Sequence, residues 1–283
     1  MRVNQSRYFT HTFDMSNTNP TADGPSRVPA SYGEFEGDRQ FATTLARGLE
    51  LLRCFTPEHT LLGNKDLAAR MQLPRPTISR LTYTLMAMGY LAQDPASGKY
   101  RLGSAVLSLG FPLLETFPVR QRARPGMLEL AQAVRGTVAI AIRDRMDMVC
   151  IEVTRVGERA GHPIDIGRSY SMCGTAVGRA YLAACSPAER QSLINQLQVK
   201  APAEWARHQA QLQHNLAQYA QRGCCVSVGE VYADVQAVAV PLGRLERGEV
   251  AAINVSFQRR RLDERWLVEE VAPQLVSLAR RLN

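Results

Sequence analysis

The chain of 283 residues is long enough for one large domain or two of ordinary size. Hydrophobic residues make up 45% of it and charged residues 21%, a composition that excludes global disorder. A formal charge of +8 and a pI near 9.4 make a polyanion a reasonable partner. No apolar run approaches the ~20 residues that span a bilayer, and the polar N-terminus lacks a signal core, so we expect a cytoplasmic protein.

The first 40 residues are rich in Asn, Thr, Ser, Pro and Gly and show no sustained period, which predicts a flexible arm. The arm carries four basic and five acidic residues. It therefore lacks the positive run that a minor-groove arm needs. We expect folded structure to begin near residue 41.

Folded structure begins with two predicted helices. In the first, leucines recur at helical spacing from Leu45 to Leu52, behind an N-cap at Thr43 or Thr44. The second is a short helix capped by Asn64, and a tight turn follows it. A turn of this kind before another helix is typical of a helix-turn-helix.

The helix after the turn opens at Pro76 and ends at Gly89, which is placed as a left-handed C-cap. Its inward stripe is apolar and consists of Ile78, Leu81, Leu85 and Met88. Residues 90–102 then predict a β-hairpin with a turn at 94–98. Three helices and a hairpin in this order make a winged helix-turn-helix.

The outward side of this helix carries groups that suit nucleic acid. Ser79, Arg80 and Tyr83 lie opposite the apolar stripe, and Arg75 and Thr77 lie at the N-terminal end. An ordinary amphipathic surface helix is the alternative. The neighbouring turn and hairpin favour DNA binding, as does a local charge of +4, from eight basic and four acidic residues in 41–105. The candidate DNA contacts are Arg47, Arg75, Thr77, Ser79, Arg80, Tyr83 and Lys99.

The rest of the chain alternates helices and strands. An apolar segment through residue 118 predicts a linker helix with a break at Pro112, and Gly223 ends a long polar helix. Ser186 and Pro187 have the N-cap and N1 order of another helix start. The remaining helices are expected at 122–134, 175–184 and 264–282, and the strands at 137–143, 148–156, 163–168, 224–228, 237–242 and 250–257. This order predicts an α+β domain around a largely antiparallel sheet.

An ordered series of short motifs resembles the IclR family of bacterial transcriptional regulators. The matching stretches are LARGL at 45–49, LPRPTISRL at 73–81, GYL at 89–91, YRLG at 100–103, GTV at 136–138, MVCIE at 148–152, GTAVGRAYLA at 174–183 and AVAVPL at 237–242. A lone helix-turn-helix pattern is common, whereas this series is specific. It covers everything but the arm.

The resemblance implies a winged helix-turn-helix over residues 41–105 and a linker helix over 106–120 that takes part in dimerisation. It implies a C-terminal α/β effector-binding domain over 121–283, with a mainly antiparallel, GAF-like sheet. The family's ligands are often small carboxylates or aromatic catabolites, and neither a cofactor nor a metal is implied. Carried over by motif, the ligand-binding residues are Ala176, Val177, Ser227, Val235, Ala237, Asn254 and Ser256. Gly174 and Thr175 are added to them from the residues themselves, as the start of the helix that opens at this site.

The residues themselves support part of this pocket. Asn254 and Ser256 alternate with apolar neighbours and so project from one face of a strand. The helix that starts near Gly174 offers free N–H groups that suit a carboxylate. The alternative is that these are satisfied polar positions of the core. Cys173 departs from the family pattern, as does the stretch Ser227–Glu230 where an acidic pair is often seen, so the effector's identity stays open.

A thiol enzyme is the main alternative class, with Cys173 as a nucleophile at a helix N-terminus. His162 is the nearest histidine in sequence and no acidic residue is placed to orient it, so we expect no enzyme. Six cysteines without CxxC or His-rich spacing indicate reduced, mostly buried thiols. The pair Cys224 and Cys225 could be a redox sensor, although one of two adjacent strand residues is simply core. The remaining histidines are expected at the surface: His11, His59, His208 and His214.

The sequence thus predicts a regulator that binds a pseudo-palindromic DNA operator as a homodimer or a dimer of dimers. A small organic acid in the C-terminal domain would change its DNA affinity or its contacts with RNA polymerase. The alternative is a ligand-independent repressor whose C-terminal domain serves only oligomerisation. Activation or repression, the operator sequence and any redox role of the cysteine pair stay open.

Overall fold

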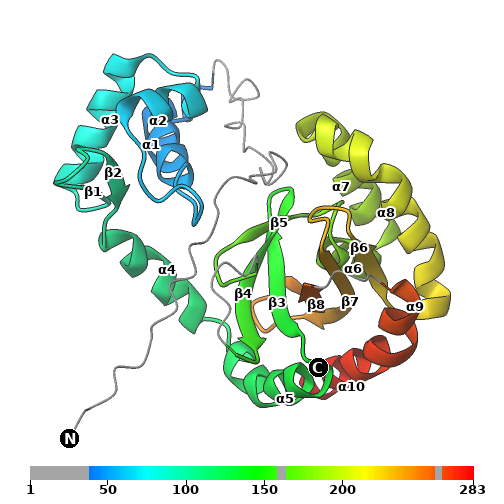
Figure 1. Cartoon of the computed structure of the whole chain (residues 1–283). Helices are drawn as coiled ribbons and strands as arrows, with labels where there is room; N and C mark the ends of the chain where they lie inside the picture. Colours follow the sequence, from blue (N-terminus) through cyan, green and yellow to red (C-terminus); the bar gives the residue numbers. More distant parts are fainter. Residues whose placement is uncertain (1–37, 158–163, 259–262) are drawn as a thin grey trace, which may run out of the picture.

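The computed structural model describes residues 38–157, 164–258 and 263–283, so the expected flexible arm lies almost wholly outside the described residues. Figure 1 shows an N-terminal helical domain and a larger C-terminal domain, joined by one helix. Among the described residues, no helix is long and apolar enough to cross a membrane.

The N-terminal domain has the helices and hairpin that the sequence predicts. Helices α1 (Thr43–Arg53), α2 (Asn64–Met71) and α3 (Arg75–Ala87) precede the antiparallel strands β1 (Leu91–Gln93) and β2 (Tyr100–Leu102). Buried residues from all three helices form one core: Leu51, Leu67, Met71, Ile78, Leu81 and Leu85. The expected inward position of Met88 is wrong, because α3 ends at Ala87 and Gly89 turns the chain with a φ of 77°.

The predicted caps of the first two helices are also wrong. Ala42 precedes α1 without a side-chain cap, and Gly63 precedes α2. The carboxylate of Asp66 accepts a hydrogen bond from the Gly63 N–H at 2.9 Å, which satisfies the start of α2. Asn64 is the first residue of α2 itself, and its Nδ2 donates to Ser79 Oγ of α3 at 3.2 Å. Its side chain therefore ties two helices together instead of capping one.

One continuous helix, α4 (Ala105–Glu115), links the two domains. The expected break at Pro112 does not occur. Proline removes one backbone donor, but its fixed φ is compatible with a helix, and only three residues of α4 follow it. The chain then enters α5 (Val119–Val134), which begins three residues earlier than predicted and also contains a proline, Pro125.

The C-terminal domain is built on a six-stranded antiparallel sheet in the order β5-β4-β3-β8-β7-β6. Its strands are β3 (Thr137–Asp144), β4 (Asp147–Arg155), β5 (Ser169–Ser171), β6 (Cys225–Val228), β7 (Val235–Arg244) and β8 (Val250–Gln258). Its helices are α6 (Ala176–Ala184), α7 (Pro187–Lys200), α8 (Pro202–Arg222), α9 (Glu264–Trp266) and α10 (Ala272–Leu282), with a π-helical turn at Leu267–Val271. The strand expected at 163–168 is displaced to β5, since residues 164–168 form a turn and Pro163 lies outside the described residues.

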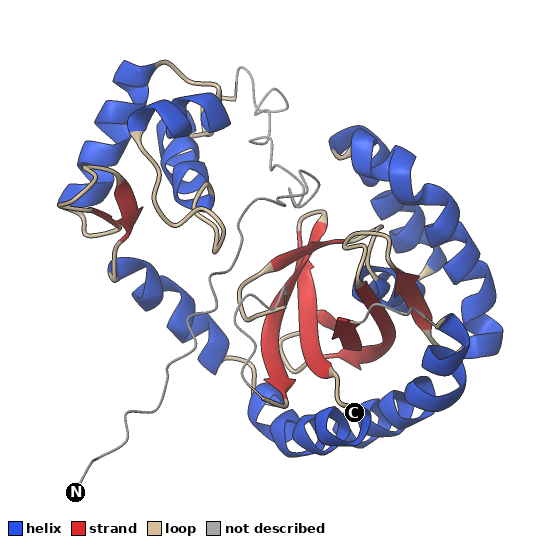
Figure 2. Cartoon of the chain, viewed as in Figure 1, coloured by secondary structure: helices blue, strands red, loops and turns tan. Residues whose placement is uncertain are grey.

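Helices cover both faces of this sheet (Figure 2). α5 and α10 pack on the face that presents bulky side chains such as Val138, Ile140 and Ile253. α6, α7 and α8 pack on the other face. The second face carries small residues at alternate positions of the three central strands: Ala139, Ala141, Ala237, Ala239 and Ala252. Small side chains leave room between the sheet and α6, and that room is the cavity described below.

The cysteines are free, and five of the six are buried, as predicted. Both Cys224 and Cys225 belong to the packed interior because helices cover both faces of the sheet. Burial raises the pKa of Cys225 to about 12. A thiol in that state is a poor nucleophile.

Candidate functional sites

The outer side of α3 forms a polar surface on the N-terminal domain. Arg75, Ser79 and Arg80 are exposed, Tyr83 is 75% exposed, and Thr77 is partly exposed. Lys99 of the hairpin is exposed too, and its Nζ lies 3.9 Å from Asp66 Oδ2. Arg47 belongs to α1 and is only partly exposed. The structure thus places most of the predicted DNA contacts on the accessible side of α3 and on the wing.

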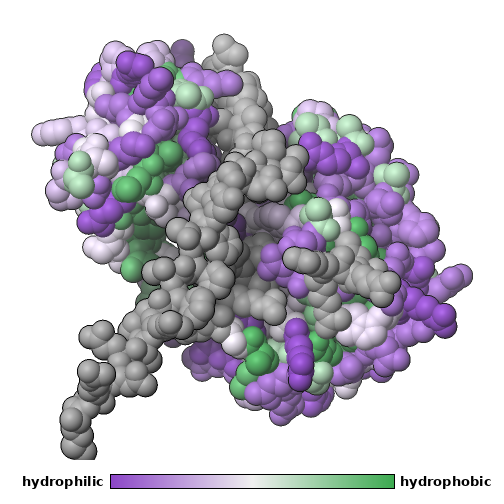
Figure 3. Space-filling view, viewed as in Figure 1, coloured by the Kyte–Doolittle hydropathy of each residue, from purple (hydrophilic) through white to green (hydrophobic). Residues whose placement is uncertain are grey.

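The N-terminal half also exposes apolar side chains, on α1 and on the linker helix α4. Leucines of α1 and several residues of α4 are exposed, and Figure 3 shows hydrophobic side chains gathered on the lower part of this domain. The exposed apolar residues are Leu45, Leu49, Leu107, Leu109, Phe111 and Leu113. Exposed apolar side chains that form a contiguous patch are typical of a protein–protein contact.

A cavity lies between the small-residue face of the sheet and the start of α6. It holds about 590 Å³ between atoms when its open mouth is included. Eight of the nine predicted ligand-binding residues line it: Thr175, Ala176, Val177, Ser227, Val235, Ala237, Asn254 and Ser256. Gly174 does not line it, and its carbonyl oxygen accepts a hydrogen bond from Ser227 Oγ at 3.2 Å.

Sequence reasoning missed much of the cavity wall. The missed residues are Ala139, Ala141, Cys150, Ile164, Tyr170, Val231 and Tyr232. The alternation of alanines with bulky residues along β3 is a signal that could have indicated the first two. No sequence pattern connects the two tyrosines, which come from β5 and from the loop before β7.

The cavity has a polar edge with unused hydrogen-bonding groups. Asn254 is only 6% exposed, and within the described part of the chain its side-chain amide has no hydrogen-bond partner. The N–H groups of Ala176 and Val177, in the first turn of α6, likewise lack partners among the described residues. Thr175 caps α6 and accepts from the Gly178 N–H at 3.3 Å. Ser256 Oγ donates to the Thr137 carbonyl at 3.4 Å.

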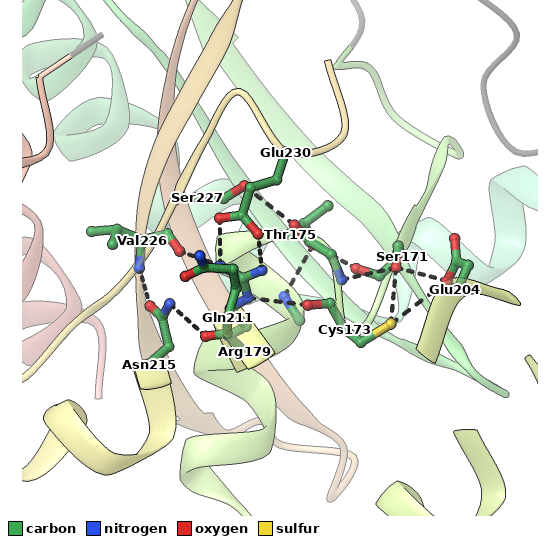
Figure 4. A network of polar contacts seen from close by, with 12 residues as sticks. Ser171, Cys173, Thr175, Arg179, Glu204, Gln211, Asn215, Val226, Ser227 and Glu230 are labelled. Carbon is green, nitrogen blue, oxygen red and sulfur yellow. Dashed lines mark hydrogen bonds and ion pairs between the residues drawn. The ribbon is translucent and has the colours of Figure 1, made fainter. Parts of the chain in front are cut away.

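A buried ion pair fixes the loop that covers the cavity. The guanidinium of Arg179 is completely buried and pairs with the carboxylate of Glu230 (Figure 4). The same guanidinium donates to the carbonyls of Cys173 at 3.0 Å and Val226 at 2.7 Å. Because Glu230 directly precedes Val231 and Tyr232 of the cavity wall, the pair holds that wall against α6.

Cys173 is surrounded by hydrogen-bonding groups but is not activated. Its Sγ lies 3.5 Å from Ser171 Oγ and 3.8 Å from Glu204 Oε2 (Figure 4). Burial raises the pKa of the Cys173 thiol to about 11. The group is therefore protonated near neutral pH, unlike the thiolate that a nucleophile requires.

His208 is buried, so the expectation that it lies at the surface is wrong. It is buried on α8, and a Cβ at Gly174 would lie 3.0 Å from its ring. Burial lowers its pKa, so the imidazole stays neutral near pH 7. His214 is exposed as expected, His59 is partly exposed, and His11 and His162 lie outside the described residues. In the described ranges no group of three or more His, Cys, Asp or Glu residues could hold a metal ion.

A winged helix-turn-helix joined to a helix-covered sheet with a small-molecule cavity defines a class: DNA-binding transcriptional regulators with a sensor domain. A family model described as bacterial transcriptional regulator IclR C-terminal matches residues 112–283, and the IclR helix-turn-helix domain matches residues 44–95. The chain belongs to the IclR family of transcriptional regulators. Its relatives are regulators, which are not enzymes.

Individual relatives agree with this membership. The HTH-type transcriptional regulator TsaQ1/TsaQ2 of Comamonas testosteroni is 35% identical over 205 residues, which are 71% of this chain and 73% of the relative. The crystal structure of an IclR family transcriptional regulator from Brucella abortus is 39% identical, with a TM-score of 0.76 over 90% of this chain and 96% of that one. An IclR homologue from Microbacterium hydrocarbonoxydans, crystallised with 4-hydroxybenzoate, shares the fold at 22% identity and a TM-score of 0.62, over 84% of this chain and 97% of that one.

Proposed function

We propose that this chain binds a pseudo-palindromic operator as a homodimer or a dimer of dimers. In this proposal α3 enters a major groove, because a recognition helix presents its N-terminal half to base edges. The side chains that would face the DNA are those of Arg75, Thr77, Ser79, Arg80 and Tyr83. Lys99 and Arg47 are proposed to contact phosphates, which position the protein without reading sequence. The exposed apolar residues of α1 and α4 supply the dimer contact.

We further propose that the cavity binds a small organic acid and that binding alters DNA affinity or contacts with RNA polymerase. The observation that carries this proposal is Asn254, a residue only 6% exposed whose side-chain amide opens onto the cavity and makes no hydrogen bond within the described part of the chain. Enclosing such an amide without hydrogen bonds is costly, so it depends on water or on a ligand for its partners. A ligand that completes its hydrogen bonds removes that cost.

The cavity favours an anion through backbone groups. Within the described chain, none of its lining residues carries a charged side chain. The N–H groups of Ala176 and Val177, together with the positive end of the α6 dipole, are suited to a carboxylate. The alanines of the sheet that line the cavity, together with Val177, suit a ligand whose remaining part is flat or apolar. The 4-hydroxybenzoate of the Microbacterium structure combines both features.

A thermal-shift experiment on the full chain tests this proposal. We expect benzoate and 4-hydroxybenzoate to raise Tm, since a ligand at about 100 times its Kd stabilises the folded state by about 2.7 kcal/mol. Benzamide is the matched neutral control, because it has the same ring without the charge. Equal shifts by benzoate and benzamide would contradict recognition of an anion.

A ligand-independent repressor is the second candidate, and the apolar surface of α1 and α4 favours it as an oligomerisation device. The two candidates make different predictions for a broad panel of carboxylates and neutral compounds. If no compound raises Tm and an Asn254 variant regulates normally, the C-terminal domain serves only assembly.

A further inference from the structure

The N-terminal and C-terminal domains are joined by ion pairs as well as by α4. Arg53 Nη2 of α1 lies 2.6 Å from Asp144 Oδ2 at the end of β3. Arg145 Nη1, in the turn between β3 and β4, lies 3.4 Å from Glu50 Oε1 of α1. This contact is at the end of the sheet opposite to the one that follows α5 (Figure 1). The domains therefore touch at a second place, remote from the linker.

A third pair brings the turn between α1 and α2 to the strand β5. Arg168, next to β5, pairs with Glu58. Glu58 lies in a turn that a backbone bridge between Thr56 and His59 closes. Partial burial acts to raise the pKa of Glu58, but the hydrogen bond and the positive charge of Arg168 help to hold it below its usual value. The carboxylate is thus charged at neutral pH and available to the arginine.

Arg168 is also tied to the wall of the cavity. The Cys150 N–H donates to the Arg168 carbonyl at 3.0 Å, and the Gly167 N–H donates to the Cys150 carbonyl at 2.8 Å. Tyr170 follows two residues later, and both Cys150 and Tyr170 line the cavity. A displacement of this wall therefore moves the backbone that carries the Arg168 guanidinium.

The turn between β3 and β4 holds Arg145, which pairs with Glu50, in an unfavourable backbone conformation. Arg145 has a φ of 56°, in the left-handed region that favours glycine or asparagine. The turn holds two residues, Arg145 and Met146, between the paired residues Asp144 and Asp147. Two-residue hairpin turns prefer glycine, asparagine or aspartate at these positions. The arginine supplies what glycine cannot, a side chain that reaches Glu50. A strained residue in this place is consistent with a functional contact.

We propose that these ion pairs transmit the state of the cavity to the DNA-binding domain, with the pair of Arg168 and Glu58 as the contact that senses the cavity wall. The inference rests on the proposed function, because it assumes a ligand in the cavity and DNA on α3. A ligand shifts the domains by its differential affinity for the arrangements with and without this contact. The coupling is reciprocal, so DNA bound to the N-terminal domain must in turn affect the cavity wall.

Reciprocity allows a test that needs no effector. Hydrogen exchange is measured on the full chain, with and without a duplex that the parent chain enriches from a randomised pool. We expect the duplex to change exchange of the Cys150 and Gly167 amides by at least about fivefold, the lower end of usual coupling. In Glu58→Gln the duplex still binds, but this change is lost. The double variant Glu58→Arg with Arg168→Glu restores it.

Glu269→Gln is the matched control. It breaks an exposed pair in which Arg265 Nε lies 2.9 Å from Glu269 Oε1, within the C-terminal domain alone. This variant should keep the full exchange change. If the parent binds the duplex without any change at these amides, or if Glu58→Gln keeps the change, the inference is overturned and the proposed function stands. Failure of the parent to bind any duplex overturns both.

Discussion

Replacing Asn254 by leucine should stabilise the protein and abolish its ligand response. Leucine has a similar shape and no polar atoms, so it removes an amide that makes no hydrogen bond within the described part of the chain and opens only onto the cavity. Leaving such a group unsatisfied costs about 1–3 kcal/mol. We expect a gain near the lower end, about 1 kcal/mol, because water can enter a cavity with an open mouth. For a domain of this size, that gain raises Tm by about 2–4 °C.

Asn215→Leu is the matched comparison, since Asn215 is buried to a similar degree but both ends of its side-chain amide are hydrogen-bonded. Its Nδ2 donates to the Gln211 carbonyl at 2.9 Å, and its Oδ1 accepts from the Val226 N–H at 2.7 Å (Figure 4). Removing the amide leaves the buried Val226 N–H without its partner and should cost about 1–3 kcal/mol. Calorimetry of both variants, with and without 4-hydroxybenzoate, measures the two effects. If Asn254→Leu lowers Tm as Asn215→Leu does, Asn254 is a satisfied structural residue and the proposed ligand site is wrong.

Four further changes test the remaining assignments. Arg80→Ala should weaken operator binding by roughly 1–3 kcal/mol in a salt-controlled anisotropy titration, and unchanged affinity would remove Arg80 from the interface. Lys99→Ala should lower affinity for every sequence and reduce the salt slope by about one unit; a sequence-dependent loss would assign it to base readout instead. Phe111→Glu should shift the protein toward monomer in sedimentation, because it places a charge in the apolar surface of α4; an unchanged dimer would locate the interface elsewhere. Cys173→Ser should preserve DNA binding and effector response, since a thiol with a pKa of about 11 is protonated near neutral pH; loss of the effector response with DNA binding intact would give the thiol a role in the response.

The predictions that depend on periodicity were confirmed, and those that depend on single positions were often wrong. The stripe of Ile78, Leu81 and Leu85 is buried because a helix repeats its facing every three to four residues. Met88 fits the same stripe but falls beyond the last helical residue. Thr43 and Asn64 are good caps by residue type, yet each is the first residue of its helix, and the cap position falls on Ala42 and Gly63. Helix boundaries depend on neighbours that a local pattern does not contain.

The cavity was predictable only in part for the same reason. Asn254 and Ser256 could be paired because two residues along a strand share a face. Tyr170 and Tyr232 meet through the fold of β5 and a loop, more than sixty residues apart in sequence. His208 lies on a helix of largely polar composition, and its burial depends on packing beside Gly174 that no helical wheel reveals. Residues brought together by tertiary contacts carry no local signal of one another.

The energetics of the domain contact suit a switch. Exposed or half-exposed ion pairs contribute about 0–1 kcal/mol each, so three of them hold the domains together by at most a few kcal/mol. A free-energy difference of that size between two domain arrangements leaves the minor one populated enough for a ligand to select it. The usual coupling between sites, about 1–3 kcal/mol, is then sufficient to invert the balance. A large apolar interface in the same place would have fixed one arrangement, and no small molecule in the cavity could have released it.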